Sequence, residues 1–338
     1  METKVPMKMR REALFALGIG ALAVRGIFAA SLGAPAQQAA KVYRIGILEA
    51  IPSERNAANL DALRKGLREL GYVEGRNLII EYRSSDGRAE RFPQLASELV
   101  RLNVDLIFAR GTPAVTATKN ATGTIPVIMA TMGNPSALVS SFARPGGNVT
   151  GVTTFSTELT AKRIELLREL VPNLARIAFL QNMGNPAAPP EWEETKRAAR
   201  ALRLQPELID VRSEHELGLA FERAARQRID GLVVGADGLT QLHQHTIVAL
   251  AARHRLPAVY PSREFVEAGG LIAYAVNYPD LYLRVANYAD KIFKGANPAD
   301  IPVEQPARFL LVINLKAANA LGLTIPQSLL VRTDDVIR

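Results

Sequence analysis

Residues 44–82 read RIGILEAIPSERNAANLDALRKGLRELGYVEGRNLIIEY, and this stretch decides the fold. Two apolar runs, Arg44–Leu48 and Leu78–Tyr82, flank a segment in which leucines recur at helical spacing. The helix is expected to stop at Gly71, because glycine readily adopts the left-handed conformation that ends many helices. Apolar runs of this kind are typical of strands buried on both faces of a parallel sheet. The stretch therefore predicts a strand, a helix and a second strand parallel to the first.

The same alternation of apolar runs and amphipathic stretches continues along the chain and predicts an α/β protein. At 338 residues, the chain exceeds the size at which a single hydrophobic core usually stops growing. We therefore expect two Rossmann-like lobes, each a parallel sheet flanked by helices, with a cleft between them. The predicted division assigns residues 42–150 and about 277–302 to lobe 1 and residues 151–276 and about 303–338 to lobe 2.

The first crossing between the lobes is placed at Val149–Thr153, directly after a Gly- and Pro-rich segment. Further strands are expected at residues 105–109 and 126–130 in lobe 1 and at 176–180, 207–211, 231–235, 257–260 and 271–275 in lobe 2. Helices of lobe 2 are expected at residues 157–170, 191–202, 214–227 and 239–254, and a long helix is expected at residues 280–294.

The first 36 residues have the features of a secretory signal peptide. Four basic residues precede the apolar run Ala13–Val24, and small residues follow, with cleavage expected near Ala36. The apolar run is shorter than the roughly 20 residues that a membrane-spanning helix needs, and the chain has no cysteine on which a lipid anchor could be built. We expect export by the general secretory (Sec) route rather than the twin-arginine route, and a monomeric periplasmic protein without stable membrane insertion.

Charge, histidine spacing and missing motifs disfavour several function classes. Loss of the leader removes five basic and two acidic side chains and lowers the formal net charge from +8 to +5, which does not indicate a nucleic-acid partner. His243 and His245 would lie on different faces of a helix, so no metal site is predicted. The sequence has no Gly-x-Ser-x-Gly elbow, no Walker loop, and no glycine in residues 47–56, where a dinucleotide-binding turn would lie. An enzyme is disfavoured, and no cofactor is predicted.

Several segments resemble a known family, the ABC transporter substrate-binding proteins of the tryptophan/tyrosine type. These segments are RGTPA at 110–114, ARPGGNVTG at 143–151, REFVEAGG at 263–270 and FLLVIN at 309–314. The resemblance implies the type I periplasmic binding fold, in which two lobes close on a small molecule. It also implies an ABC permease and its ATPase as partners, and it suggests an aromatic or other amino acid as the ligand.

Candidate ligand-binding residues of lobe 1 lie in the loops after predicted strands, because parallel α/β sheets bind ligands beyond the carboxyl ends of their strands. Backbone N–H groups and the Thr112 hydroxyl could hold a carboxylate, although a strand-to-helix turn without a ligand is the alternative. Glu49 could meet an ammonium group, whereas Ser53 is expected to cap the following helix, and Asn134 is a cap or a ligand donor. The lobe 1 candidates are Glu49, Ser53, Gly111, Thr112, Pro113, Ala114 and Asn134.

Candidate residues of lobe 2 combine polar groups with aromatic rings. Asp237 is the preferred partner of a ligand ammonium, and its alternative role is that of a turn former beside Gly238. Aromatic side chains near strand ends could stack on the ligand, although packing in the core is their default. Trp192 is expected on the surface or in a lid contact. The lobe 2 candidates are Phe155, Asn182, Asp237, Tyr260 and Tyr274.

Three other classes of protein remain open on the sequence alone. A periplasmic sensor that presents its ligand to a receptor would have the same two lobes. A LacI-like repressor shares the architecture but carries a helix-turn-helix, whereas this chain begins with a secretion leader. An α/β enzyme is less favoured because its motifs are missing. We therefore predict an extracytoplasmic solute-binding component of an ABC importer, with the ligand sensor as the alternative.

Overall fold

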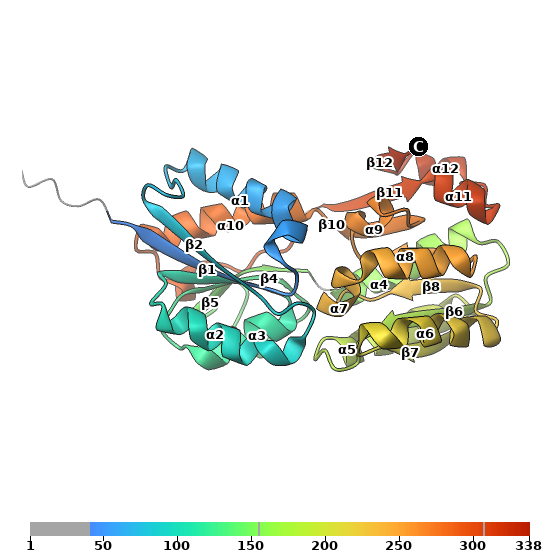
Figure 1. The fold of residues 1–338 in the computed structure, drawn as a ribbon, viewed down its shortest axis with the longest axis horizontal. Coiled ribbons are helices and arrows are strands. Elements are labelled where there is room, and N and C mark those ends of the chain that lie inside the picture. Colours follow the sequence, from blue (N-terminus) through green and yellow to red (C-terminus); the bar gives the residue numbers. More distant parts are fainter. Residues whose placement is uncertain (1–40, 155, 307) are drawn as a thin grey trace, which may run out of the picture. The chain divides into compact units, whose positions relative to one another are not determined.

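The structure, a computed structural model, describes residues 41–154, 156–306 and 308–338, and within it residues 42–338 form one compact unit. The predicted signal peptide, residues 1–36, and the candidate Phe155 lie outside the described residues. The described strands form two separate sheets, each flanked by helices, so the predicted pair of α/β lobes is confirmed (Figure 1). None of the helices in the described part of the chain is both long and apolar enough to cross a membrane.

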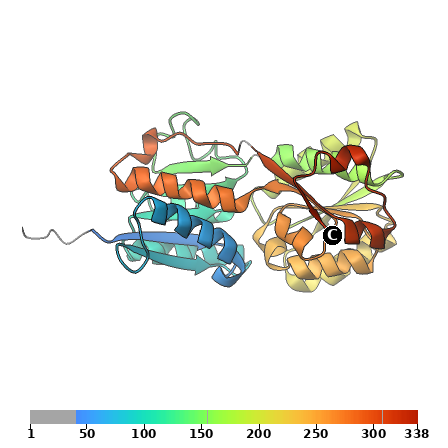
Figure 2. The same cartoon turned by 90° about the horizontal axis from the view of Figure 1, so that it is seen from above.

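Lobe 1 is built on a parallel sheet with the strand order β2-β1-β3-β4-β5. Helices α1 and α10 lie side by side on one face of this sheet, and α2 and α3 cover the other (Figure 2). The strands are β1 (Tyr43–Glu49), β2 (Leu78–Ser84), β3 (Leu106–Arg110), β4 (Val127–Met132) and β5 (Val149–Thr153). The helices are α1 (Ala57–Glu69), α2 (Phe92–Arg101), α3 (Thr112–Ala121) and α10 (Tyr278–Phe293).

The opening strand–helix–strand unit forms as its apolar pattern predicts. Strand β1 pairs with β2 in parallel, in register from Tyr43 with Leu78 to Glu49 with Ser84. Helix α1 buries its leucine stripe against the sheet and α10, and the chain turns away from the helix at Gly71, which has a φ of 92°. Burial of this apolar stripe, rather than helix propensity, supplies most of the stability of such a helix.

Lobe 2 is built on a larger sheet with the strand order β12-β11-β10-β9-β8-β6-β7. Its strands are β6 (Arg176–Gln181), β7 (Gln205–Asp210), β8 (Gly231–Val234), β9 (Ala258–Tyr260), β10 (Ile272–Val276), β11 (Phe309–Asn314) and β12 (Asp335–Ile337). One face packs on α4 (Ser156–Leu170), α5 (Ala188–Ala201), α11 (Leu315–Leu321) and α12 (Gln327–Leu330). The other packs on α6 (Glu214–Arg226), α7 (Gly238–Leu242), α8 (Gln244–Arg253) and α9 (Arg263–Glu267).

Three details differ from the sequence-based expectation. Val149–Thr153 does not cross between lobes but forms β5 of the lobe 1 sheet, because its apolar residues are buried beside β4. Strand β11 runs antiparallel to β10, so the lobe 2 sheet is not wholly parallel. The helix predicted at residues 239–254 is two helices, since the chain leaves helical geometry at His243.

Candidate ligand-binding site

A cleft is lined by loops that follow the strands of both lobes. It encloses about 960 Å³ of space not filled by atoms, part of it open to solvent. The lobe 1 lining includes Ala50 after β1, Ser85 after β2, Gly111 after β3 and Gly133 after β4. The lobe 2 lining includes Asn185 after β6, Ala236 after β8 and Pro261 after β9, and Tyr278 joins the lining at the start of α10, directly after β10. The cleft therefore lies at the carboxyl ends of both sheets, as expected for parallel α/β proteins.

The structure places four of the sequence-predicted candidates in the lining of this cleft. They are Gly111, Thr112, Pro113 and Asp237. Ala114 is buried in the lobe 1 core, and Asn134 is exposed, with its side-chain oxygen accepting a 2.9 Å hydrogen bond from the Ser136 N–H in a local turn. Asn182 does not line the cleft itself, but its amide donates a 3.3 Å hydrogen bond to Oδ1 of Asp237, which does.

The turn between β3 and α3 brings backbone N–H groups to the cleft. Gly111 has φ 86° and ψ 154°, a combination that is essentially restricted to glycine, and α3 begins at the next residue with Pro113 in its first turn. The Thr112 hydroxyl accepts a 3.4 Å hydrogen bond from the Gly133 N–H, which ties this turn to the loop after β4. The unpaired N–H groups of the first helical turn favour a negatively charged ligand group.

Substitution of Gly111 by alanine is expected to lower the free energy of unfolding by about 1–3 kcal/mol, the usual cost of holding a non-glycine residue in such a conformation. The added methyl group itself would meet only Pro113, at 4.0 Å, so the effect comes from the backbone. Urea denaturation of Gly111→Ala beside Gly123→Ala measures it, since Gly123 has open space around it and no positive φ. Equal stability of the two variants would contradict this account.

Asp237 combines both roles that the sequence left open. Its side chain accepts from the Leu239 N–H at 2.8 Å and closes a capping box with Thr240 at the start of α7. The same carboxylate accepts from the Asn185 amide at 2.8 Å and lines the cleft. Burial raises the pKa of Asp237 above its ordinary value, and these hydrogen bonds offset the rise only in part. A cation from a ligand would therefore stabilise its charged form.

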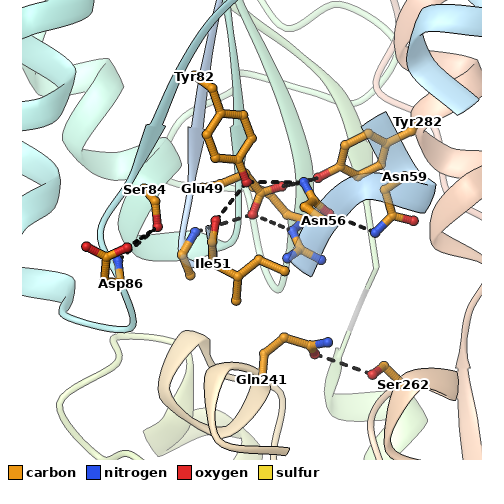
Figure 3. A network of polar contacts seen from close by, with 12 residues as sticks. Glu49, Ile51, Asn56, Asn59, Tyr82, Ser84, Asp86, Gln241, Ser262 and Tyr282 are labelled. Carbon is orange, nitrogen blue, oxygen red and sulfur yellow. Dashed lines mark hydrogen bonds and ion pairs between the residues drawn. The ribbon is translucent and has the colours of Figure 1, made fainter. Parts of the chain in front are cut away.

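Glu49 does not line the cleft but lies beneath it, fully buried. Its carboxylate forms an ion pair with Arg110, 2.8 Å from Nε, and accepts a hydrogen bond from the Tyr282 hydroxyl (Figure 3). The Asn56 amide joins this network, donating to the hydroxyl oxygens of Tyr282 at 3.0 Å and Tyr82 at 3.3 Å. The Glu49 carboxylate is thus already paired with a cation of the protein and does not meet a ligand ammonium group. Of the two residues in this pair, Arg110 lines the cleft.

Ser53 does not cap the following helix. It lies within a single turn of 3₁₀ helix, Ser53–Asn56, that precedes α1, and its hydroxyl donates to Glu54 at 3.0 Å. The position before α1 is Asn56, whose side chain joins the Glu49 network and makes no capping bond. Ser53 is also absent from the lining of the cleft.

The aromatic candidates pack in the protein rather than line the cleft. Tyr260 is 1% exposed and stacks on Phe265 with ring centroids 5.0 Å apart, and Tyr274 packs against Phe309 at 5.7 Å. Trp192, expected on the surface or in a lid contact, is half-buried, stacks on Phe179 and is absent from the lining of the cleft. The aromatic residues that line the cleft in their place are Phe92 and Tyr278, and the centre of the Tyr278 ring lies 4.9 Å from the Arg110 guanidinium.

Two arginines that sequence reasoning missed line the cleft. Burial by itself would lower the pKa of Arg110, but Glu49, Tyr282 and Tyr278 together raise it, whereas burial lowers the pKa of Arg163. Arg163 on α4 is 2% exposed, and its Nε donates to the Tyr274 carbonyl at 2.9 Å. The charge of Glu191, which also lines the cleft, acts to raise the pKa of Arg163, but burial outweighs it. Arg110 could have been found from the sequence, because it is a charged residue at the end of an apolar strand. No sequence signal distinguishes Arg163 from the other basic residues of α4.

The fold and the cleft together define the class, a two-lobed α/β protein that binds a small solute between its lobes. The chain belongs to the ABC transporter substrate binding protein family, whose model matches residues 44–337. Its fold is that of the type I periplasmic binding proteins. Proteins of this family bind a small molecule outside the cytoplasm for an ABC permease, and they are not enzymes.

Relatives with named ligands are similar along most of the chain. A tyrosine-binding protein of Clostridioides difficile (strain R20291) is 26% identical over 271 residues, which are 78% of each chain. The ABC domain of Streptococcus pneumonia in complex with L-Trp is 29% identical, with a TM-score of 0.81 over 88% of this chain and 100% of that one. The ligand-free, open structure of a substrate-binding protein with adhesive properties from Clostridium difficile is 25% identical, with a TM-score of 0.63 over 88% of this chain and 99% of that one.

Proposed function

We propose that this protein delivers an aromatic amino acid to an ABC importer by closing its two lobes around the ligand. The observation that carries the ligand class is a cleft lined by basic side chains, Arg110 and Arg163, and by the carboxylates of Asp237 and Glu191, together with apolar residues. Arg163 and the first turn of α3 suit the carboxylate of an amino acid, and Asp237 suits its ammonium group. Phe92, Pro113 and Tyr278 offer apolar surface for its side chain.

The relatives support this ligand class. One is described as a tyrosine-binding protein, and another was crystallised with L-tryptophan. The present structure is more similar to that tryptophan complex than to the ligand-free, open relative. This supports a closed arrangement of the lobes in the present structure, which is the arrangement that buries a ligand. Export through the predicted signal peptide by the Sec route and a monomeric state belong to the same proposal.

The direct test is calorimetric titration of the mature chain with L-tyrosine, L-tryptophan and L-phenylalanine, with myo-inositol as an unrelated solute. A dissociation constant of about 1 µM, which corresponds to about −8 kcal/mol, would be ordinary for this task. A ligand that binds only the native state must also raise the melting temperature. Absence of both signals for all three amino acids would overturn the proposed ligand class.

Replacement of Asp237 by asparagine is expected to weaken binding of L-tyrosine by about tenfold or more, because a hydrogen bond to a charged group contributes about 1.5–3 kcal/mol. Asparagine keeps the helix cap of α7, since both residues are strong N-caps, so the change removes the charge and spares the local fold. Calorimetry on the wild type and Asp237→Asn measures the difference.

The matched control is 3-(4-hydroxyphenyl)propionate, which has the carboxylate and ring of tyrosine but no ammonium group. Its affinity should not differ between the two proteins. Wild-type affinity for L-tyrosine should also fall as the pH is lowered through the raised pKa of Asp237, at a higher pH than for an ordinary aspartate, whereas the variant should lack this step. Equal losses for both ligands would remove Asp237 as the ammonium partner.

A further inference from the structure

Ser85 is a buried serine whose hydroxyl has no hydrogen-bond partner among the described residues. The residue is 0% exposed and lines the cleft, directly after the end of β2. A buried hydroxyl without a partner is unfavourable, and the large majority of such groups in native proteins are paired. Its position in the cleft points to a ligand atom as the missing partner.

The local fold does not require this hydroxyl. The backbone holds the turn, because the Ser85 N–H donates to the Glu49 carbonyl at 2.9 Å and the Ser85 carbonyl accepts from the Arg88 N–H at 3.1 Å. The neighbouring Ser84 shows the contrasting case, since its hydroxyl donates to Asp86 at 2.8 Å and accepts from the Asp86 N–H at 3.0 Å (Figure 3). The Ser84 hydroxyl therefore stabilises the turn, whereas the Ser85 hydroxyl is available to a ligand in the cleft.

Apart from Ser85, the cleft lining that comes from residues 50–92 is apolar, and the Arg91 guanidinium donates to the Ser85 carbonyl, at 3.3 Å, rather than to its hydroxyl. Lining residues of the same part of lobe 1 are Ala50, Gly87, Ala89 and Phe92, whose side chains offer no hydrogen-bonding group. The Gly87 N–H donates to the Ala50 carbonyl at 2.8 Å, so the loops after β1 and β2 lie directly against each other here. A flat apolar group would fit against these small residues and Phe92, with a single hydroxyl available to a polar atom on it.

We infer that Ser85 determines specificity: it hydrogen-bonds a polar atom on the ligand's aromatic ring and so selects an amino acid with a phenol hydroxyl or an indole N–H over phenylalanine. This inference rests on the proposed function and names the part of the ligand that the lobe 1 end of the cleft recognises. A site that offers a hydrogen bond to such a group discriminates against the analogue that lacks it, because its own polar group is then left unpaired.

The test is calorimetric titration of the wild type and Ser85→Ala with L-tyrosine, L-tryptophan and L-phenylalanine. The wild type is expected to bind tyrosine or tryptophan at least tenfold more tightly than phenylalanine. Ser85→Ala should lose about tenfold in affinity for that preferred ligand and change less than about twofold for phenylalanine. Ser84→Ala serves as the control, because loss of its turn hydrogen bonds should leave the ratio of the affinities unchanged.

Two results overturn the inference while leaving the proposed function intact. One is an equal loss for all three ligands in Ser85→Ala, which would indicate a structural role, and the other is no change for any of them. Failure of the wild type to bind any of the three amino acids would instead overturn the proposed ligand class and this inference with it. The melting temperature of ligand-free Ser85→Ala should equal or exceed that of the wild type, since the change removes an unpaired buried polar atom.

Discussion

Replacement of Glu49 by alanine should lower the free energy of unfolding by about 3–5 kcal/mol, because removal of one partner of a buried ion pair leaves the other charge uncompensated. Arg110 is 9% exposed and cannot shed its proton, and its 2.8 Å bond to Glu49 is the ion pair that neutralises it. The substitution also removes the acceptor of the Tyr282 hydrogen bond, so the contact between β1 and α10 is weakened as well.

Urea denaturation measures this effect, with Glu74→Ala as the matched control. Glu74 also pairs with an arginine at 2.8 Å, Arg64, but its side chain is 42% exposed, so its loss should cost less than about 1 kcal/mol. The double variant Glu49→Ala, Arg110→Met should recover part of the lost stability, because it removes the stranded charge. A loss in Glu49→Ala no larger than that in Glu74→Ala would show that the buried pair contributes little.

The Glu49 network also explains why sequence reasoning chose the right loop but the wrong residue. The apolar run of β1 predicts where the strand ends and therefore that Glu49 lies at the carboxyl edge of the sheet, where ligands bind. The sequence does not show that Arg110, 61 positions later, ends the neighbouring strand and comes within ion-pair distance of it. The pairing depends on β1 lying beside β3, which is a property of the sheet order rather than of either segment.

Strands with a strong apolar pattern were predicted well, and segments whose partner lies far away in the chain were not. The parallel pairing of β1 with β2 follows from the local strand–helix–strand pattern, whereas β11 takes its antiparallel direction from the path of the chain after α10. Strand β12 is three residues long and carries little apolar signal of its own. Likewise, Val149–Thr153 has the same composition whether it crosses between lobes or completes a sheet, so only its pairing with β4 decides.

The residues of the cleft also divide into those with a local sequence signal and those whose position depends on distant contacts. Gly111 and Asp237 follow strand ends and carry local signals, a glycine before a helix and an aspartate at an N-cap, so sequence alone could identify them. Arg163 lies in the middle of α4, on an amphipathic helix where a basic residue is ordinarily a solvated surface group. Its burial depends on β10, whose Tyr274 carbonyl accepts its hydrogen bond from 111 positions away.

The two lobes also touch each other beside the cleft, through α7. Arg55 of lobe 1 donates a hydrogen bond to the Leu242 carbonyl at the end of α7. Gly238, at the start of the same helix, faces Ala50 of lobe 1 so closely that a methyl group added to it would lie 2.6 Å from the Ala50 Cβ. Since Asp237 precedes Gly238, the carboxylate that we propose as the ammonium partner and the contact between lobes belong to one short segment.

Replacement of Gly238 by alanine is therefore expected to weaken ligand binding by about tenfold to a hundredfold, because overpacking a tight contact costs about 1–3 kcal/mol. The clash is between residues of different lobes, so it opposes closure and leaves each lobe free to fold. The melting temperature of the ligand-free protein should stay close to that of the wild type, while calorimetry should show the loss of affinity.

A compensating change makes this prediction specific. With Ala50→Gly in the same chain, the atom nearest to the added methyl group becomes the Ala50 Cα at 3.9 Å, an ordinary van der Waals distance. The double variant should therefore recover most of the wild-type affinity, which a general disturbance of α7 or of the Asp237 cap would not allow. If Gly238→Ala bound its ligand as tightly as the wild type, the loops after β1 and β8 would not meet in the liganded protein, and closure would have to bury the ligand through other contacts.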